Sequence, residues 1–288
     1  MNDYQFSIII PHYNSYDLLY RCLSSIPQTN DIQVIVIDDS SSNQHRLLNI
    51  VSKFQNVTLK VLSNNSGAGR ARNEGLKIAK GKWIIFSDAD DYFLNGAFDI
   101  FRRYCNSLSD IIYFKVESRD SITGALCPRG DRYNILIDNY KSNKVQTINA
   151  LKYRYYVPWG KMISNAFIHE HKLQFEEVKY SNDVMFGVMS ANFASNVEVS
   201  SEIVYCVTVT DNSLTKNMSK QAFICRYQAA VRQALYMKEI NQSRYSVVLL
   251  RFVIKSLKYG LSCTKEILKI GMKAKVSFLA GLSRYIIR

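Results

Sequence analysis

Four short apolar runs recur through the first third of the chain, and each ends in small polar or acidic residues. The runs are residues 6–10, 33–37, 58–62 and 83–86. Apolar residues at helical spacing fill the intervals, at residues 17–26, 46–54 and 71–79. Alternation of strand and helix every ~25 residues is typical of βαβ units. The sequence therefore predicts an α/β fold with a largely parallel sheet flanked by helices.

The pattern becomes less regular after residue 91. We expect a helix at residues 98–105, a strand at 110–116, a helix at 183–194 and a strand at 203–209. Residues 117–145 are polar and predict irregular structure. The chain from about Lys220 onward has helical spacing, which predicts helices to its end.

Positive charge is concentrated in the last quarter of the chain. The 288 residues carry a formal net charge of +13. Residues 215–288 contain 15 Lys and Arg against two acidic residues, so residues 1–214 are neutral. Basic and aromatic residues there match no recognised nucleic-acid-binding module, which argues against a nucleic-acid partner. The sequence thus predicts a neutral body followed by a basic helical region.

Neither the apolar runs nor the cysteines indicate a membrane span or a secreted protein. No apolar run approaches the ~18 residues that a spanning helix needs. The six cysteines are scattered singly, without a CxxC pair, and the first residues do not resemble a secretory signal. We therefore expect reduced thiols in a cytoplasmic protein.

Three carboxylates stand close together directly after the fourth apolar run, at Asp88, Asp90 and Asp91. Carboxylates packed this closely repel one another, and a hard cation such as Mg²⁺ or Mn²⁺ relieves the repulsion. Taken alone, the same pattern also fits a solvated turn. Its position favours a site, because ligands bind at the carboxyl ends of parallel strands.

The other three runs also end in residues that suit a nucleotide. Pro11-His12-Tyr13-Asn14 could hold a base, and Asp38-Asp39 could accept from a nucleobase or a ribose hydroxyl. After the third run, Gly67 and Gly69 allow close backbone approach, and Arg70 and Arg72 suit phosphate. Neither the dinucleotide fingerprint nor a P-loop occurs. A parallel sheet would bring all four loops to one edge.

These loops resemble those of family 2 glycosyltransferases with the GT-A fold. The resemblance rests on residues 7–14, 36–41, 65–73 and 86–91, which have the family's order and spacing. Residues 158–162 resemble its W-N-K-L segment, and residues 181–186 its E-D-x-x-F segment. It implies a Rossmann-like GT-A domain with a mixed, mainly parallel sheet at residues 1–214, where about 1–100 bind the nucleotide sugar and 101–214 the acceptor. Residues 215–288 form the basic helical C-terminal region.

The resemblance also implies a role for each matching residue in an inverting transfer from a UDP-sugar. Asp183 would be the general base and Asp90 the ligand of Mn²⁺ or Mg²⁺. The implied nucleotide-sugar contacts are Pro11, Tyr13, Asn14, Asp39, Gly67, Arg70, Arg72, Asp88 and Ala89. The implied acceptor contacts are Trp159, Lys161 and Asn182.

Three positions depart from the family pattern. His12 stands where a small apolar residue is usual, Gly160 where Asn is usual, and Asn182 where an acidic residue is usual. The loss of the acidic neighbour of Asp183 affects the expected acceptor contacts more than the expected base.

The basic region has two interpretations. Leu250, Ile254, Leu257 and Leu261 share a helical face beside basic residues, which is typical of a helix lying on anionic lipid. Alternatively, these helices pack on the body and expose a basic face. With a membrane-bound tail, we expect a peripheral enzyme at the inner face of the cell membrane. Its acceptor would be a glycan or a lipid-linked saccharide of bacterial surface polysaccharide synthesis.

Two other functions compete with this hypothesis. A nucleotidyltransferase would need a phosphate-binding loop rich in Gly, Arg and Lys after the first strand, where this chain has residues 11–14. An inactive membrane-bound scaffold would not need the full set of carboxylates that this sequence keeps.

Overall fold

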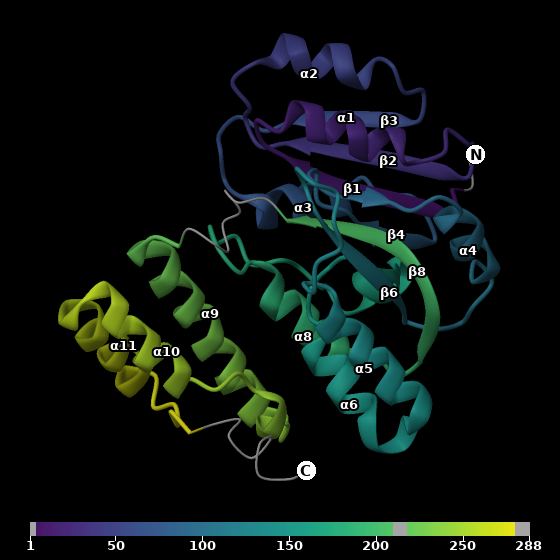
Figure 1. Cartoon of the computed structure of the whole chain (residues 1–288). Helices are drawn as coiled ribbons and strands as arrows, with labels where there is room; N and C mark the ends of the chain where they lie inside the picture. The colour runs from purple at the N-terminus through teal and green to yellow at the C-terminus, as the bar shows by residue number, and fades with distance from the viewer. Residues whose placement is uncertain (1–3, 210–217, 280–288) are drawn as a thin grey trace.

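The protein is described by a computed structural model that places residues 4–209 and 218–279. Its centre is an eight-stranded sheet in the order β3-β2-β1-β4-β7-β6-β8-β5. The sheet is mixed: β4 with β7, β6 with β7 and β5 with β8 are antiparallel, and the other pairs are parallel. Helices flank it (Figure 1). The predicted α/β fold is confirmed.

The first half of the chain forms the predicted βαβ units. Their strands are β1 (Phe6–His12), β2 (Ile32–Asp38), β3 (Val57–Val61) and β4 (Trp83–Phe86), and their helices are α1 (Tyr16–Ser24), α2 (Gln44–Val51) and α3 (Ala68–Leu76). The strands run parallel, and β1, β2 and β4 are almost entirely buried. Continuous β-branched runs are typical of such strands, because helices cover both faces of a parallel sheet.

β1 does not end at Pro11, as the sequence suggested, but continues to His12. β4 pairs with β1 only as far as Ile9, whereas β2 remains paired to the end of the strand. Beyond Ile9 the strand has one neighbour, and a residue without an N–H group is tolerated there. The extension carries His12 and Tyr13 to the sheet edge.

The second half of the chain completes the sheet and adds helices. Its strands are β5 (Tyr92–Phe93), β6 (Ile111–Asp120), β7 (Lys161–Ser164) and β8 (Val197–Val209), and its helices are α4 (Ala97–Arg103), α5 (Asp131–Ser142), α6 (Lys144–Arg154), α7 (Asn165–Glu170) and α8 (Asp183–Phe193). The prediction of irregular structure at residues 117–145 was wrong, because this stretch holds the end of β6, all of α5 and the start of α6. α5 buries only Tyr133, Ile137 and Tyr140, so its apolar stripe is too narrow to stand out in a polar sequence.

Aromatic packing fixes the segment that leads into α8. The rings of Phe175 and Phe186 stack with centroids 4.0 Å apart, and both meet Phe86 of β4 edge-on at 5.0 Å and 5.5 Å. All three side chains are buried. The amino end of α8 is therefore held against the carboxyl end of β4.

The basic region is helical where the structure describes it. Its elements are α9 (Lys220–Glu239), η1 (Ser243–Tyr245), α10 (Leu250–Ser256), η2 (Leu257–Tyr259) and α11 (Leu261–Lys273). They enclose a second core that includes Phe223, Tyr227, Leu249 and Ile267. α9 lies between α8 and the pair α10 and α11 (Figure 1). The predicted helices are thus confirmed as far as residue 273, and residues 280–288 lie outside the described part.

An ion pair ties this region to the body. The Arg232 guanidinium of α9 donates two hydrogen bonds to the Glu176 carboxylate, at 2.5 Å and 2.9 Å. Glu176 belongs to the loop that leads into α8. Among the helices in the described ranges, none combines the length and hydropathy needed to cross a bilayer.

Candidate active site

A cavity of about 380 Å³ opens at the carboxyl ends of β1 and β4, where the sequence predicts the site. The predicted site residues that line it are Pro11, Tyr13, Arg72, Asp88, Ala89, Asp90, Trp159, Asn182 and Asp183. These residues come from the end of β1, from four loops and from α3 and α8, so the sheet brings together segments more than 100 positions apart in the chain. Asn14, Asp39, Gly67, Arg70 and Lys161 do not line it.

Asp39 and Gly67 form the support of the glycine loop rather than the cavity wall. The Asp39 carboxylate accepts hydrogen bonds from the backbone N–H groups of Ser66 and Gly67, both at 2.7 Å. Gly67 has φ of +90°, a conformation that residues with a Cβ rarely adopt. Asp39 thereby fixes the turn that begins α3, beside the cavity.

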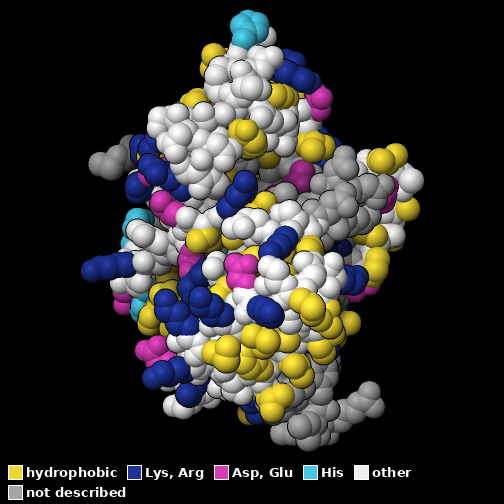
Figure 2. All heavy atoms as spheres, turned by 90° about the vertical axis from the view of Figure 1, so that its left-hand side faces the viewer, with side chains coloured by type: hydrophobic (Ala, Val, Ile, Leu, Met, Phe, Trp, Pro, Cys, Tyr) yellow, Lys and Arg dark blue, Asp and Glu magenta, His cyan; other side chains and the backbone are white. Residues whose placement is uncertain are grey.

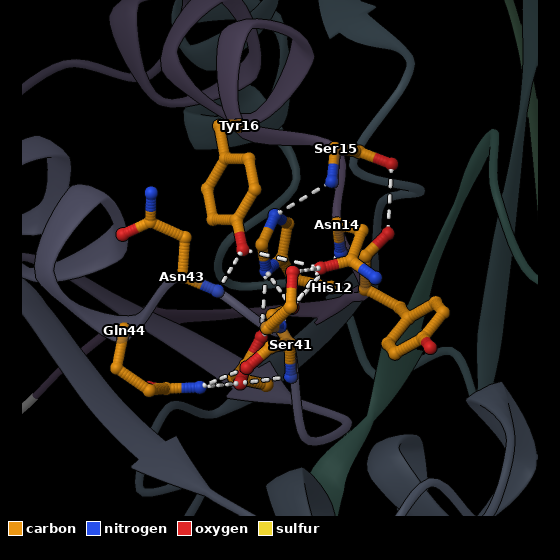
Figure 3. Close-up of polar contacts among 10 residues, drawn as sticks. His12, Asn14, Ser15, Tyr16, Ser41, Asn43 and Gln44 are labelled. Carbon is orange, nitrogen blue, oxygen red and sulfur yellow. Dashed lines mark hydrogen bonds and ion pairs between the residues drawn. The ribbon is translucent and has the colours of Figure 1, made fainter.

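His12, the first departure from the family pattern, belongs to a buried polar network (Figure 3). Its Nδ1 lies 2.8 Å from Asp38 Oδ1, and its Nε2 accepts from the backbone N–H of Ser15 at 3.1 Å. The second contact requires an unprotonated Nε2, so the proton is on Nδ1 and points at Asp38. Burial lowers the pKa of His12, with Asp38 opposing it. The neutral imidazole thus links the loop after β1 to the end of β2.

Asn14 strengthens the same link from the outside. Its backbone has φ of +51°, and its side-chain oxygen accepts from the Ser42 N–H at 2.9 Å and from the Tyr16 hydroxyl at 3.1 Å. Figure 3 shows the amide oxygen turned toward the Tyr16 hydroxyl. Asn14 therefore orders the loop that carries Tyr13, which is 49% exposed.

The three predicted carboxylates lie together. One oxygen from each of Asp88, Asp90 and Asp91 falls within 4.8 Å of the others. Burial and the charge of Asp88 raise the pKa of Asp90 to about 6. Burial and the charges of Asp90 and Asp88 raise the pKa of Asp91. A hard divalent cation fits this donor set, because carboxylate oxygens are its preferred ligands and its charge offsets their repulsion.

Asp91 also has a structural role that the sequence does not reveal. Its buried carboxylate accepts from the Tyr205 hydroxyl at 3.0 Å and from the backbone N–H of Thr208 at 2.7 Å. Both partners belong to β8. Asp91 therefore holds the carboxylate cluster against β8. Within the cluster, Asp88 and Asp90 are more exposed than Asp91.

Arg72, rather than Arg70, faces the cavity. Its Nη2 donates to Asp88 Oδ1 at 2.5 Å, and its Nη1 donates to Asn182 Oδ1 at 2.9 Å. Its guanidinium lies over the Phe175 ring at 5.2 Å. Arg70 is exposed and outside the cavity lining. The two arginines differ because only one of them faces the sheet from α3.

Asp183 is the first residue of α8 and lines the cavity. Burial raises the pKa of its carboxyl group above the usual value, and the Arg72 cation opposes that rise. A carboxylate with a raised pKa is a stronger proton acceptor, which suits a general base. Asn182, in the place of the usual acid, instead accepts the hydrogen bond from Arg72.

Lys161 supports the cavity wall from beneath. It is buried, and its Nζ donates to the backbone carbonyl of Tyr155 and, at 2.7 Å, to that of Val157. Burial lowers the pKa of Lys161 to about 7. These bonds hold the turn that carries Trp159, whose ring stacks on Tyr205 with 6.2 Å between centroids.

Gly160 explains the second departure from the family pattern. Its φ is +69°, in the left-handed region. Asn, which is usual at this place, is among the residues that enter this region most readily after glycine. A Cβ at Gly160 would lie 2.2 Å from the Tyr155 hydroxyl, so this chain also needs the space.

The cavity includes residues that the sequence analysis missed. Arg129 precedes α5, Thr208 is the last residue but one of β8, and Arg226 comes from α9. Arg129 and Arg226 belong to no motif, and only the fold brings them to the site. Thr208 belongs to the strand expected at residues 203–209, but the strand pattern does not reveal its neighbour Asp91.

The chain matches the model of glycosyl transferase family 2 over residues 7–161 and belongs to that family. It is 26% identical over 298 residues to the poly(ribitol-phosphate) beta-N-acetylglucosaminyltransferase TarP of Staphylococcus aureus, covering 97% of this chain and 88% of TarP. It is 41% identical over 92 residues to WfaP of Escherichia coli, a UDP-Glc:alpha-D-GlcNAc-diphosphoundecaprenol beta-1,3-glucosyltransferase, covering 31% of this chain and 36% of WfaP. Two further relatives are also much longer than the part that matches, since the match covers 31% and 35% of their lengths.

A solved structure shares the fold. The crystal structure of S. aureus TarS 1–349 in complex with UDP-GlcNAc superposes with a TM-score of 0.70 at 22% identity, covering 94% of this chain and 81% of that one. The GT-A fold predicted from the sequence is therefore confirmed, and so is membership of family 2.

Proposed function

We propose that this family 2 glycosyltransferase moves a sugar from a UDP-sugar to a hydroxyl group of a bacterial surface polysaccharide or its lipid-linked precursor. One observation carries the proposal: a single cavity is lined by the end of β1 and the loop after it, an acidic cluster and a separate carboxylate at the start of α8. These are Pro11 and Tyr13, Asp88 and Asp90, and Asp183. Relatives named for transfer to poly(ribitol-phosphate) and to GlcNAc-diphosphoundecaprenol support the class of acceptor.

The donor would lie along the carboxyl edge of β1 and β4. The loop of Pro11 and Tyr13 would hold the uracil. Asn14 would order this loop, and Asp39 would order the neighbouring glycine loop. Arg72 would lie beside the diphosphate because, of the two arginines of the glycine loop and α3, it is Arg72, and not Arg70, that lines the cavity. The donor-bound TarS structure supports a UDP-sugar as the donor class.

Asp183 would remove the proton of the acceptor hydroxyl as its oxygen attacks the anomeric carbon. The new glycosidic bond forms while the bond to the UDP oxygen breaks, and the electron pair leaves with UDP. One displacement inverts the anomeric centre. The relatives' β-linked products support this outcome, because UDP-glucose carries an α-linked sugar.

A divalent cation is the expected partner of the acidic cluster. Asp90, with Asp88 beside it, would hold Mn²⁺ or Mg²⁺, which when bound neutralises charge on the departing diphosphate. Arg72 already occupies one side of Asp88 and keeps it directed at the cavity. The nucleotidyltransferase alternative is weaker, because the family match covers residues 7–161.

The experiment that tests this proposal is a donor screen. Purified protein is incubated with a panel of UDP-sugars, Mn²⁺ and either a ribitol-phosphate oligomer or a GlcNAc-diphosphate lipid, and UDP release is measured. We expect one UDP-sugar to give acceptor-dependent release. If no UDP-sugar supports release with either acceptor, the proposed function is wrong and the inactive-scaffold alternative gains support.

We further propose that the C-terminal region binds anionic membrane, which would place the enzyme at the inner face of the cell membrane. Large apolar side chains are exposed on its helices: Ile254 is 61% exposed, Leu257 57%, Leu261 72% and Met272 64%. Figure 2 shows hydrophobic side chains gathered over these helices with Lys and Arg beside them. We name Ile254, Leu257, Leu261 and Met272 the apolar patch. Such a patch with a basic border is typical of surface-bound helices.

Vesicle sedimentation tests the membrane proposal. The wild type should bind vesicles that contain phosphatidylglycerol and not purely zwitterionic ones. A triple variant with Ile254→Ser, Leu257→Ser and Leu261→Ser should lose most binding, whereas Leu108→Ser, at an exposed apolar residue before β6, should not. Equal vesicle binding by the triple variant and by Leu108→Ser would refute the proposal. It would also be refuted if the wild type formed an oligomer that the triple variant does not form.

A further inference from the structure

A second cavity, of about 420 Å³, lies between the catalytic body and the C-terminal helices. Its body side is formed by α5, α8 and the segments before α8 and after α6, and its other side by α9 and α10. The residues that line it are Arg132, Tyr156, Ser181, Val184, Met218, Phe223, Arg226, Ala230, Gln233, Val247, Val248, Arg251, Phe252 and Lys255. We call it the basic cavity.

The side chains of the basic cavity favour an anion. Arg132, Arg226, Arg251 and Lys255 line it, and no acidic residue of the described ranges does. The three arginines carry planar forks that suit phosphate oxygens, and their charge does not depend on pH near neutrality. Arg251 and Lys255 stand one helical turn apart on α10, so both reach the same space.

The rest of the wall is apolar and aromatic. Phe223 of α9 and Phe252 of α10 lie with ring centroids 5.7 Å apart, beside Val247 and Val248. A wall of this kind suits the carbon backbone that carries an anionic group better than a free, fully hydrated ion. The cavity therefore combines cationic side chains with an apolar and aromatic surface.

The basic cavity is next to the catalytic one. Arg226 lines both, and Ser181 and Val184, which line the basic cavity, stand on either side of Asn182 and Asp183, which line the catalytic one. A hydroxyl group placed at Asp183 thus leaves the remainder of its molecule close to the four cations. The ion pair of Arg232 with Glu176 holds α9 in this position.

We propose that the basic cavity binds a phosphate group of the acceptor, next to the unit whose hydroxyl is glycosylated. This inference rests on the proposed function and adds a substrate class to it: acceptors that carry a phosphodiester or diphosphate close to the reacting hydroxyl. It also assigns the C-terminal helices a part in acceptor recognition that is separate from the apolar patch. All four side chains are exposed, but only Arg251 and Lys255 line the cavity, whereas Ile254 and Leu257 do not.

The test compares charge-removing variants with a matched control. Arg251→Gln and Lys255→Gln remove cations from the basic cavity, and Lys238→Gln removes an exposed cation at the far end of α9. Steady-state KM and kcat are measured with three acceptors: a ribitol-phosphate trimer, GlcNAc-diphosphate on a short alkyl chain, and unphosphorylated ribitol. UDP-sugar hydrolysis without acceptor reports on the donor site.

We expect Arg251→Gln and Lys255→Gln each to raise KM for one phosphate-bearing acceptor at least about tenfold, as loss of a charge-assisted hydrogen bond does. In both variants, KM for ribitol, kcat and donor hydrolysis should stay at wild-type values. The control Lys238→Gln should keep wild-type values for every acceptor. The acceptor that responds identifies the source of the phosphate. Unchanged KM with both phosphate-bearing acceptors would overturn the inference, and so would an equal loss with ribitol. Failure of the proposed function is a different result, because the wild type itself would then consume no UDP-sugar.

Discussion

Arg72 and Asp88 form an ion pair at the centre of the catalytic cavity, with 2.5 Å between Nη2 and Oδ1. The same guanidinium also donates to Asn182, the residue before Asp183. One side chain of α3 therefore connects the acidic cluster after β4 with the start of α8, which links the donor side of the cavity to the expected base.

This relationship makes Arg72 more sensitive to substitution than its charge alone requires. Arg72→Lys keeps the positive charge, but a single ammonium group does not reproduce the fork that joins Asp88 to Asn182. We expect kcat to fall at least about tenfold, because misplacement of groups around the reacting atoms is costly. Arg70→Lys, at the exposed arginine two positions earlier, is the matched control and should keep wild-type kinetics. Equal effects of the two substitutions would contradict the assignment.

Gly69 tests the packing that positions the base. A Cβ at this residue would lie 2.2 Å from the backbone oxygen of Glu176 and 2.9 Å from Asn182 Cβ. Gly69→Ala should therefore push the loop before α8 away from α3. We expect kcat to decrease by about tenfold or more while UDP still binds, since a shift of ~1 Å at a catalytic group has an effect of this size. Isothermal titration with UDP and steady-state transfer assays measure the two quantities. Wild-type kcat in Gly69→Ala would show that the loop is not held by this contact.

His12 predicts how stability changes with pH. Burial lowers its pKa from 6.5 in the folded state, so below pH 6.5 the unfolded chain binds a proton that the folded protein does not. The free energy of unfolding should then fall as pH falls, by up to about 1.4 kcal/mol per pH unit. Above pH 6.5 this contribution is constant. The lowered pKa of Asp38 acts only below its ordinary value of 3.8, outside this range.

Urea unfolding of the wild type and of His12→Asn at pH 7.5 and 5.5 isolates this effect. Groups other than His12 titrate in both proteins, and their contributions cancel in the difference between them. The wild type should lose more stability than the variant between the two pH values. An equal loss in both would show that His12 takes up its proton in the folded protein as easily as in the unfolded chain.

The acidic cluster predicts dependence on a divalent cation. EDTA should abolish transfer, and excess Mn²⁺ should restore it, because the carboxylates repel one another and a bound diphosphate adds further negative charge. Asp90→Asn should weaken Mn²⁺ binding measured by titration in the presence of UDP. Asp99→Asn, at an exposed acid of α4, is the control. Full activity in excess EDTA would exclude a metal from the reaction.

The sequence predicts the sheet and the edge at which the cavity opens, for a local reason. Each strand of the first half is a short, mainly apolar run, and its candidate functional residues follow it within a few positions. Asp88 and Asp90 can be recognised as candidates from the sequence, because three neighbouring carboxylates require either a bound cation or a solvated turn. Parallel pairing then brings such loops to one edge without any further information.

The sequence predicts only part of the acceptor side. Trp159, Asn182 and Asp183 belong to motifs and line the cavity, whereas Arg129 and Arg226 reach it through tertiary packing. Arg226 lies on a helix whose pattern reports only its own buried face, and α5 is hidden by the polar residues around Tyr133 and Ile137. The roles of Asp39 and Lys161 also depend on packing. Both side chains are buried beside the cavity and hydrogen-bonded to backbone groups. A sequence motif does not show whether such a residue supports the cavity wall or contacts the ligand.

Asp183→Asn tests the central claim most directly. The substitution keeps the shape of the side chain and removes the expected proton acceptor. UDP release with the responding UDP-sugar, its acceptor and Mn²⁺ should fall by about 10²–10⁴-fold, the range that general base catalysis contributes, while UDP binds as in the wild type. Turnover close to the wild-type rate would contradict Asp183 as the base, and with it the mechanism proposed for this glycosyltransferase.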